Sequence, residues 1–191
     1  MQVLKEEIRM RILHAAVESF YVDGFAKSKM KTIAEHATIP VGLVYSYYKS
    51  KKDLLDAVVM PVYRKITTLL RNESAGNNDT HYFFETEIPF LIDLLETDRK
   101  QAVILIDKCA GTKYEAAKDE FINLAKTHIK NYITSKKVTD MEVKDDLFHH
   151  MLATNLMESF FEITRHYKDA EWAKKMIALL AQYHFYGLEG L

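Results

Sequence analysis

The chain has 191 residues, a formal net charge of −1 at neutral pH, six glycines and three prolines. This length predicts one or two domains, and so few turn-forming residues argue against a protein built from many short strands. The sole cysteine, Cys109, excludes an intramolecular disulfide and suits a reducing compartment. The charged amino-terminal segment lacks an apolar signal-peptide core, and no apolar run is long enough to span a bilayer. We therefore expect a soluble, cytoplasmic protein with no membrane partner.

Charge is distributed unevenly along the chain. Residues 1–52 hold nine Lys or Arg side chains against five Asp or Glu, whereas residues 53–191 hold 17 against 22. A basic head on an acidic body suits a protein that docks one end onto DNA. Such a split also arises by chance, so it supports a DNA-binding motif without establishing one.

The amino-terminal 50 residues predict three helices. Apolar side chains at helical spacing place the first at 5–23, and Gly24 ends it. The second covers 29–37. Pro40 lacks an N–H and cannot continue a helix, but it suits the first turn of a third helix at about 41–47. Two short helices joined this closely are typical of a helix-turn-helix.

Polar side chains mark the start of two helices. Ser28 is the expected N-cap of the second helix. Ser50 and Asp53, three residues apart, form a capping-box-like start for a fourth helix over 51–72. Pro61 lies inside this helix and predicts a kink there.

The rest of the chain is also expected to be helical. The segment 73–80 is the clearest linker, because it combines Gly, Asn, Ser and Asp. Five further helices are expected near 81–97, 99–110, 114–136, 142–167 and 169–187. Pro89 predicts a bend in the first of these. No strand pattern and no internal repeat is evident, so we predict an all-α fold with about nine helices.

The segment from about residue 5 to residue 59 resembles the DNA-binding domain of the TetR (tetracycline repressor) family of bacterial transcription regulators. The matching residues are Ile12, Leu13, Ala15, Ala16, Phe20, Gly24, Ile33, Ala34, Gly42, Tyr45, Tyr47, Tyr48, Ser50, Lys51, Leu54 and Leu55. The chain departs from the family at Thr38, where glycine is usual, and at Pro40, where a small polar residue is usual. The second departure removes a polar N-cap and any phosphate contact that it would make. The resemblance implies a helix-turn-helix domain at 1–50 and a helical regulatory and dimerisation domain at 51–191.

The resemblance also implies that the third helix enters the major groove of DNA. Its candidates for contact with base edges lack the bidentate groups of Arg, Asn and Gln and offer methyl, glycine and hydroxyl contacts instead. These candidates are Val41, Gly42, Leu43, Ser46 and Tyr47. Tyr45 resembles a family tyrosine that supports the helix and reaches phosphate, and Lys29 and Lys51 match positions that meet the DNA backbone. Val44 and Tyr48 fall on the other face and are expected in the core.

The last two predicted helices are apolar on more than one side, so each needs burial on two sides. The resemblance implies that they pair with their counterparts in a second subunit, and a two-fold dimer would read a palindromic operator. A larger internal core would also bury them. The candidate interface residues are Leu156, Phe160, Met176, Leu180 and Tyr183.

In this family the same domain encloses a pocket for a small molecule. Candidate lining residues are aromatic or polar, although aromatic residues at helical spacing more often belong to a plain core. They are Tyr82, Phe90, Tyr114, Phe121, His128, Tyr132, Phe148 and Asn155.

We therefore expect a ligand-responsive, sequence-specific transcriptional regulator, and the family's commoner habit favours a repressor. Its expected partners are a DNA operator, a second copy of the chain and an unknown effector. The alternatives are a helical-bundle metal enzyme and a helical adaptor that does not bind DNA. A di-iron bundle needs two Glu-x-x-His motifs, and the chain has one related pattern, Asp146 to His149. No zinc motif, phosphate-binding loop or dinucleotide fingerprint occurs, so we expect no catalytic residue, metal or cofactor.

Overall fold

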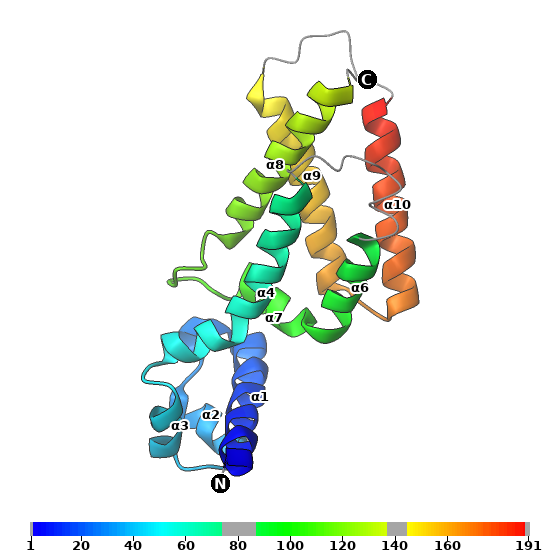
Figure 1. The fold of residues 1–191 in the computed structure, drawn as a ribbon. Helices are drawn as coiled ribbons and strands as arrows, with labels where there is room; N and C mark the ends of the chain where they lie inside the picture. Colours follow the sequence, from blue (N-terminus) through cyan, green and yellow to red (C-terminus); the bar gives the residue numbers. More distant parts are fainter. Residues whose placement is uncertain (1, 74–86, 137–144, 190–191) are drawn as a thin grey trace. The chain divides into compact units, whose positions relative to one another are not determined.

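The computed structural model describes residues 2–73, 87–136 and 145–189, and this part of the chain is all-α, with nine helices and no strand (Figure 1). The predicted fold class is confirmed. The helices are α1 (Gln2–Lys27), α2 (Met30–His36), α3 (Val41–Tyr47), α4 (Lys51–Glu73), α6 (Ile88–Thr97), α7 (Arg99–Asp107), α8 (Ala117–Lys136), α9 (Asp146–Arg165) and α10 (Ala170–Glu189). In the ranges given above, none of these helices combines the length and apolar character of a membrane span. Apart from Glu73, the predicted linker at 73–80 lies outside the described residues, as does Tyr82.

The chain divides into two units. The first comprises 1–63 and 100–116, and the second comprises 64–99 and 117–191. Helix α4 therefore contributes residues to both. Residues 51–63, which the sequence assigned to the second domain, cluster with the amino-terminal helices. The functional boundary after residue 50 stays a prediction.

The first unit has an apolar core formed by the faces that the helical period predicted. Ile12 and Phe20 of α1 are fully buried, as are Ile33 of α2 and Val44 of α3. Tyr48 is buried as well, so the prediction that Val44 and Tyr48 belong to the core is confirmed. These contacts leave the opposite face of α3 outside the core.

Two ion pairs join the segment 100–116 to the amino-terminal helices. Lys100 Nζ lies 2.5 Å from a carboxylate oxygen of Glu18 on α1, and Lys113 Nζ lies 2.6 Å from Asp56 on α4. All four side chains are partly exposed, so solvent screening leaves each pair only a small contribution to stability. The pairs set the position of the segment more than they stabilise the unit.

Gly24 interrupts α1 with a φ of 76° and a ψ of 163°. This conformation is open almost only to glycine. The Phe25 N–H leaves the helical pattern and donates to the backbone carbonyl of Lys108 at 3.0 Å, although helical turns resume as far as Lys27. The predicted end of the first helix at Gly24 is confirmed as a kink.

Ser28 does not cap α2, and the prediction that it would is wrong. The residue before α2 is Lys29, whose side chain makes no capping hydrogen bond. The buried Ser28 hydroxyl donates to the Gly24 carbonyl at 2.8 Å, and Ser19 Oγ lies 3.0 Å from it. Ser28 thus fastens the end of α1 instead of starting α2.

The predicted capping at the start of α4 is confirmed. The backbone N–H of Asp53 donates to Ser50 Oγ at 3.1 Å, and the Ser50 hydroxyl donates to the Asp53 carboxylate at 2.9 Å. Pro61 lies within α4, which continues through it, and the predicted kink stays a prediction. Pro89 occupies the first turn of α6, where a proline requires no bend.

The core of the second unit lies among α6, α9 and α10. Its fully packed members are Ile88, Leu95, Ile163, Ala173 and Ile177. Partly buried apolar side chains surround this cluster, among them Phe160, Met176 and Leu180. Helix α8 packs along α9, which completes a bundle of helices around the cavity described below.

The conformation of Gly24 predicts a stability effect. Replacing Gly24 with alanine should lower the free energy of unfolding by about 1–3 kcal/mol, because a Cβ atom is strained at this φ and ψ. Urea denaturation of the two proteins measures the difference. Gly42→Ala is the matched control, since Gly42 has no left-handed φ and an added Cβ meets no atom within 4 Å. Equal losses in both variants would contradict the strain argument.

Candidate functional site

The turn between α2 and α3 holds its shape without the glycine usual in the family. Thr38 adopts a left-handed φ of 57°, which is uncommon for a β-branched residue. The Arg11 guanidinium donates from Nη2 to the carbonyls of Ala37 at 2.5 Å and Thr38 at 2.9 Å. The Ile39 N–H donates to the Ala34 carbonyl at 3.1 Å. Arg11 therefore stabilises a turn in which Thr38 adopts a conformation that is unfavourable for threonine.

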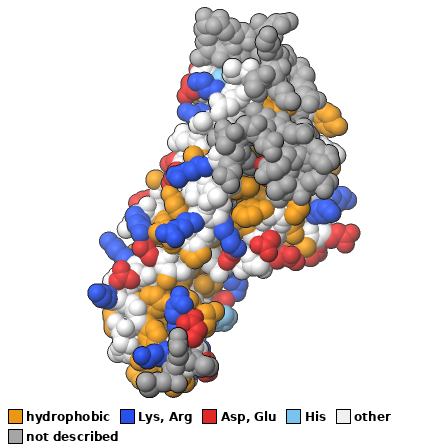
Figure 2. Space-filling model, viewed as in Figure 1, with side chains coloured by type: hydrophobic (Ala, Val, Ile, Leu, Met, Phe, Trp, Pro, Cys, Tyr) orange, Lys and Arg blue, Asp and Glu red, His pale blue; other side chains and the backbone are white. Residues whose placement is uncertain are grey.

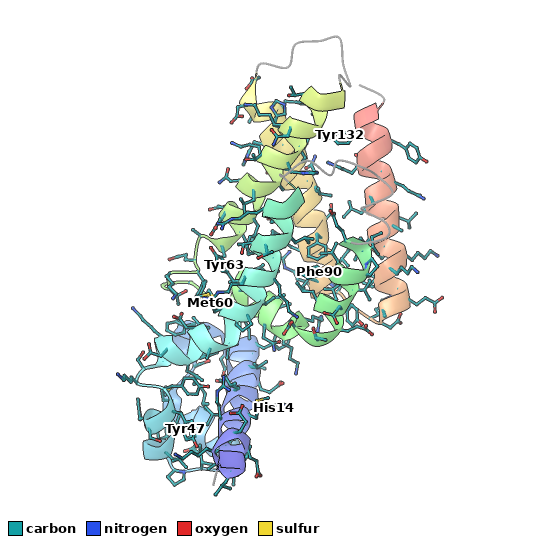
Figure 3. All side chains as sticks on the ribbon, viewed as in Figure 1. His14, Tyr47, Met60, Tyr63, Phe90 and Tyr132 are labelled. Atoms are coloured by element: carbon teal, nitrogen blue, oxygen red, sulfur yellow. The ribbon has the colours of Figure 1, made fainter. Side chains whose placement is uncertain are left out.

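Helix α3 presents the predicted contact residues at the surface of the first unit. Val41 is 39% exposed and Tyr45 is 49% exposed, while Gly42 and Ser46 are exposed as well. Leu43 and Tyr47 are half-buried, and Figure 3 labels Tyr47 on this helix. All residues of α3 except the buried Val44 therefore contribute to the surface that faces away from the core, and this surface is apolar and hydroxyl-bearing.

Two hydroxyl groups on α3 already donate within the protein. Ser46 Oγ donates to the Leu43 carbonyl at 2.7 Å, and the Tyr47 hydroxyl donates to the Lys5 carbonyl at 3.2 Å. Each oxygen keeps lone pairs that can accept. Ser46 is thus better suited to accept from an amino group of cytosine or adenine than to donate to a base.

Lys51 has partners inside the first unit. Its Nζ donates to the carbonyls of Phe25 at 2.6 Å, Ser28 at 2.8 Å and Ala26 at 3.4 Å. Partial burial lowers the pKa of Lys51. Three carbonyls match the three N–H donors of an ammonium group, so the geometry favours a structural tie over the predicted phosphate contact. Lys29 and Lys52, by contrast, are exposed, and Figure 2 shows Lys and Arg side chains spread over the visible face.

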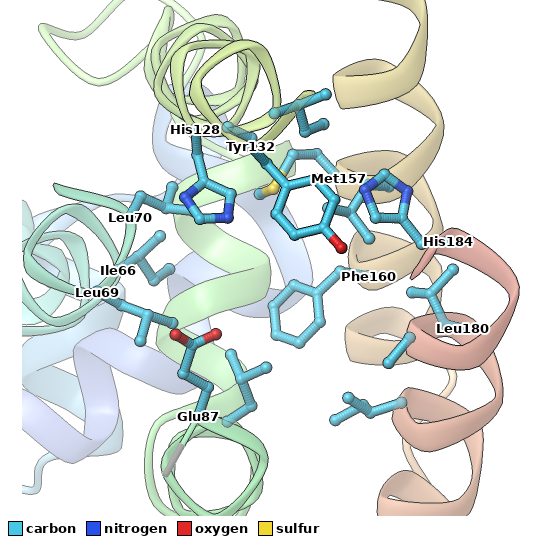
Figure 4. Close-up of a pocket in the computed structure, with 16 residues that line it drawn as sticks. Ile66, Leu69, Leu70, Glu87, His128, Tyr132, Met157, Phe160, Leu180 and His184 are labelled. Atoms are coloured by element: carbon cyan, nitrogen blue, oxygen red, sulfur yellow. The ribbon is translucent and has the colours of Figure 1, made fainter. Parts of the chain in front are cut away.

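The second unit contains a cavity that opens to solvent (Figure 4). Its empty volume is about 920 Å³ when the space at the open mouth is included. Its walls come from α4, α6, α8, α9 and α10 and are mostly apolar. The lining residues are Ile66, Leu69, Leu70, Glu87, Leu91, Ala125, His128, Ile129, Tyr132, Leu156, Met157, Phe160, Ile177, Leu180, Ala181 and His184. An apolar cavity with a few polar groups is typical of a small-molecule site.

Of the predicted pocket residues, His128 and Tyr132 line the cavity. They are four residues apart on α8 and therefore share a face. Glu87 and His184 also line it, although the sequence did not single them out. Glu87 was missed because 81–97 was read as one continuous helix, in which position 87 has no special place.

The other predicted pocket residues that the structure describes lie outside the cavity wall. Phe121 is fully buried in the core and Asn155 is exposed, while Phe90 and Phe148 are half-buried and outside the cavity wall. Tyr114 belongs to the first unit. Its hydroxyl donates to Met60 Sδ at 3.8 Å, and its ring meets that of Tyr63, whose place Figure 3 shows.

Ionisable groups give the cavity an uneven charge. Glu87 is 4% exposed and precedes α6. Burial, together with the charge of His128, lowers the pKa of His184 to about 4, so this imidazole is uncharged at neutral pH. Among the described residues that line the cavity, none is Lys or Arg. Across the described ranges, no group of three or more His, Cys, Asp or Glu could hold a metal ion.

The predicted interface residues divide between the interior and the surface. Leu156, Phe160 and Leu180 line the cavity, and Met176 packs against the core of the second unit. Tyr183 is 78% exposed. Apolar residues that the sequence did not single out accompany it at the surface, namely Leu147 and Met151 on α9 and Leu179 and Tyr186 on α10.

Comparison with known proteins agrees with this geometry. A family model for bacterial regulatory proteins of the tetR family matches residues 12–58. The regulator UidR of Escherichia coli K12 is 30% identical over 86 residues, which cover 45% of this chain and 44% of UidR. SCO3833, a TetR regulator from Streptomyces coelicolor, matches 92% of this chain and 90% of its own, with a TM-score of 0.73 and 16% identity. Residues 12–58 thus match the TetR-family helix-turn-helix domain.

The TetR-family model covers the stretch from α1 to the first turns of α4, which lies within the first unit. The chain matches less than half the length of UidR. A further solved structure is that of FadR from Bacillus subtilis in complex with stearoyl-CoA, which matches 91% of this chain and 97% of its own. Its TM-score is 0.57 and its identity is 18%. At such low identities, these solved structures show that the fold of both units is that of TetR regulators, and they do not show the function of this chain.

The surroundings of Lys51 lead to a prediction that separates its two possible roles, the structural tie and the phosphate contact. Lys51→Ala should lower the free energy of unfolding by about 1–3 kcal/mol, because several buried or half-buried carbonyls lose a charged donor. Lys52→Ala is the matched control, since Lys52 is an exposed neighbour. Urea denaturation measures both. A Lys51→Ala protein of unchanged stability, with a salt dependence of DNA binding reduced by about one unit, would instead support the phosphate contact.

Proposed function

We propose that the chain is a ligand-responsive, sequence-specific transcriptional regulator that acts as a repressor. One observation carries the proposal: a braced helix-turn-helix exposes the outer face of α3, within a stretch that matches the TetR-family model. A helix presented in this way fits the major groove. The cavity in the second unit would hold the effector, and exposed cations such as Lys29 would meet phosphates.

The names of similar proteins support this reading. UidR is described as an HTH-type transcriptional regulator, and the solved structure of FadR contains stearoyl-CoA. NalD of Pseudomonas aeruginosa, whose fold this chain shares with a TM-score of 0.64 at 19% identity, is described as the secondary repressor of a multidrug efflux pump. For this chain, DNA binding, repression and effector control are proposals.

We further propose that the chain acts as a homodimer. The exposed apolar residues Leu179, Tyr183 and Tyr186 recur at helical spacing along α10, and Leu147 and Met151 do the same on α9. A stripe of this kind suits the self-complementary interface of a two-fold dimer. Two copies of α3 would then read the two halves of a palindromic operator.

A gel-shift assay tests the proposed function directly. The purified full chain is titrated against fragments that tile the DNA around its own gene, with unrelated DNA of equal length as competitor. We expect one fragment to bind at least about a thousandfold more tightly than the competitor. If every fragment binds as weakly as the competitor, the chain is not a sequence-specific regulator.

Gly42 allows a test of the DNA surface that leaves the fold intact. An alanine at this position meets no protein atom within 4 Å, so the unfolding transition should not fall. If α3 lies against the bases, the added methyl group should weaken operator binding by about five- to a hundredfold. The wild-type protein, titrated under the same conditions, is the reference. Equal operator affinity for the variant and the wild type would place Gly42 away from the DNA.

Two neighbouring leucines test the dimer. Leu179 is 51% exposed, whereas Leu180 lines the cavity. Leu179→Glu should therefore yield a folded monomer, while Leu180→Glu should lose several kcal/mol of stability, because it buries a carboxylate among apolar side chains. Analytical ultracentrifugation and thermal unfolding distinguish the two results. A wild-type chain that is monomeric at micromolar concentration, or a Leu179→Glu variant that stays dimeric, would contradict the proposed interface.

A further inference from the structure

Helix α3 has few attachments of its own that fix its direction. It is seven residues long, and Val44 is its only buried residue. The Tyr47 hydroxyl donates to the Lys5 carbonyl at 3.2 Å, which is long for a bond between two oxygens. A helix this short and this lightly anchored takes much of its direction from the turn that precedes it.

That turn depends on the backbone conformation of one residue, Thr38. Among the described residues, Thr38 is the only one other than glycine with a positive φ, and it lies three residues before Val41, where α3 begins. A left-handed conformation is unfavourable for a β-branched side chain and persists only where surrounding contacts hold it. If Thr38 relaxed to a negative φ, the chain would enter α3 in a different direction.

Arg11 makes contacts that oppose such a relaxation. A single nitrogen of its guanidinium, Nη2, donates to the carbonyl of Ala37 at 2.5 Å and to that of Thr38 at 2.9 Å. These two carbonyls belong to the peptide groups on either side of the Thr38 Cα atom, so holding both on one nitrogen restricts the φ and ψ of Thr38. Arg11 is itself fixed to the core through α1, because the next residue, Ile12, is fully buried.

We propose that Arg11 is a positioning residue for sequence-specific DNA recognition. It holds Thr38 in the left-handed conformation and thereby directs the outer face of α3 toward the base edges. This inference rests on the proposed function, and it assigns part of the sequence specificity to a side chain that lies outside the reading helix.

The rival role for Arg11 is a phosphate contact, since its side chain is exposed. The two roles predict different losses. A phosphate contact carries no sequence information, so its removal weakens binding to all DNA alike and lowers the salt dependence. A positioning contact acts through the direction of α3, so its removal weakens operator binding much more than binding to unrelated DNA.

A double-mutant cycle on the full chain tests the proposal. The four proteins are the wild type, Arg11→Ala, Thr38→Gly and the double variant. Each is titrated by gel shift against the fragment that the wild type binds most tightly and against unrelated DNA, at several salt concentrations and at a temperature where it is folded. The Thr38→Gly background is the matched control, because the same charge is removed there while glycine adopts a positive φ without strain.

With threonine at position 38, Arg11→Ala should lower operator affinity at least about tenfold and affinity for unrelated DNA by less than about threefold. The salt dependence of binding to unrelated DNA should not change. With glycine at position 38, the same substitution should lower operator affinity by less than about threefold, since the left-handed conformation no longer needs the guanidinium.

Three results would overturn the positioning role. The first is an equal fold-loss of operator affinity in both backgrounds. The second is an equal loss on both DNAs with a salt dependence lowered by about one unit, which indicates a phosphate contact. The third is a lowered unfolding midpoint with unchanged affinities, which indicates that Arg11 only stabilises the fold. If Arg11→Ala alone does not fold, Thr38→Gly should restore a folded protein, and a double variant that stays unfolded would also overturn the role.

The wild-type titration separates this inference from the proposed function. A wild-type chain that binds every fragment as weakly as unrelated DNA would refute the regulator, and the positioning role would fall with it. Specific binding by the wild type, together with equal losses in the two backgrounds, would refute the positioning role alone and leave the regulator standing.

Discussion

The ammonium group of Lys51 donates to three backbone carbonyls between residues 25 and 28, and this contact fixes the start of α4 at the corner that follows α1. The chain turns there because Gly24 adopts a backbone conformation open almost only to glycine. The turn brings three backbone carbonyls within hydrogen-bond distance of one ammonium group. The Lys51 ammonium also lies 4.4 Å from the centre of the Phe25 ring, so one charge stabilises both the carbonyls and the aromatic side chain above them. Helices α2 and α3 lie in the chain between residues 25–28 and Lys51, which this contact joins.

A second cation holds the other end of the helix-turn-helix. Arg11 donates to the carbonyls of Ala37 and Thr38, where the turn into α3 requires a left-handed residue. A threonine in this conformation costs free energy that a glycine would not. The guanidinium offsets this cost through two charge-assisted hydrogen bonds. Lys51 and Arg11 therefore both donate to backbone carbonyls of the first unit. Fewer of the nine Lys and Arg side chains in residues 1–52 are then left to contact DNA.

The first unit could be predicted closely because its signals are local. Gly24, Pro40 and the Ser50–Asp53 pair act on the few residues around them, so the limits of α3 and the start of α4 follow from the sequence alone. Ser28 was assigned wrongly because its hydroxyl bonds to the end of α1, a choice that tertiary packing makes.

The cavity could be predicted only in part, because it depends on which faces of five helices converge. Helical spacing shows that His128 and Tyr132 share a face, and both line the cavity. The same reasoning cannot show that Phe121 turns into the core while Leu180 turns toward the cavity. Glu87 owes its place to the start of α6. Pro89 suits the first turn of a helix, but the sequence analysis took it as a bend inside a longer helix.

Helix α3 reads little sequence by itself, and this limits how a regulator built on it can work. It carries no Arg, Asn or Gln, and the hydroxyls of Ser46 and Tyr47 donate within the protein. What remains are methyl contacts from Val41 and Leu43, close approach at Gly42 and acceptance by Ser46, each weaker than a bidentate contact. Specific binding at physiological salt requires about 4–10 kcal/mol over non-specific binding. One copy of such a surface falls short of this, so the proposed dimer is a condition for specific binding, and a monomeric variant should bind DNA with little preference among sequences.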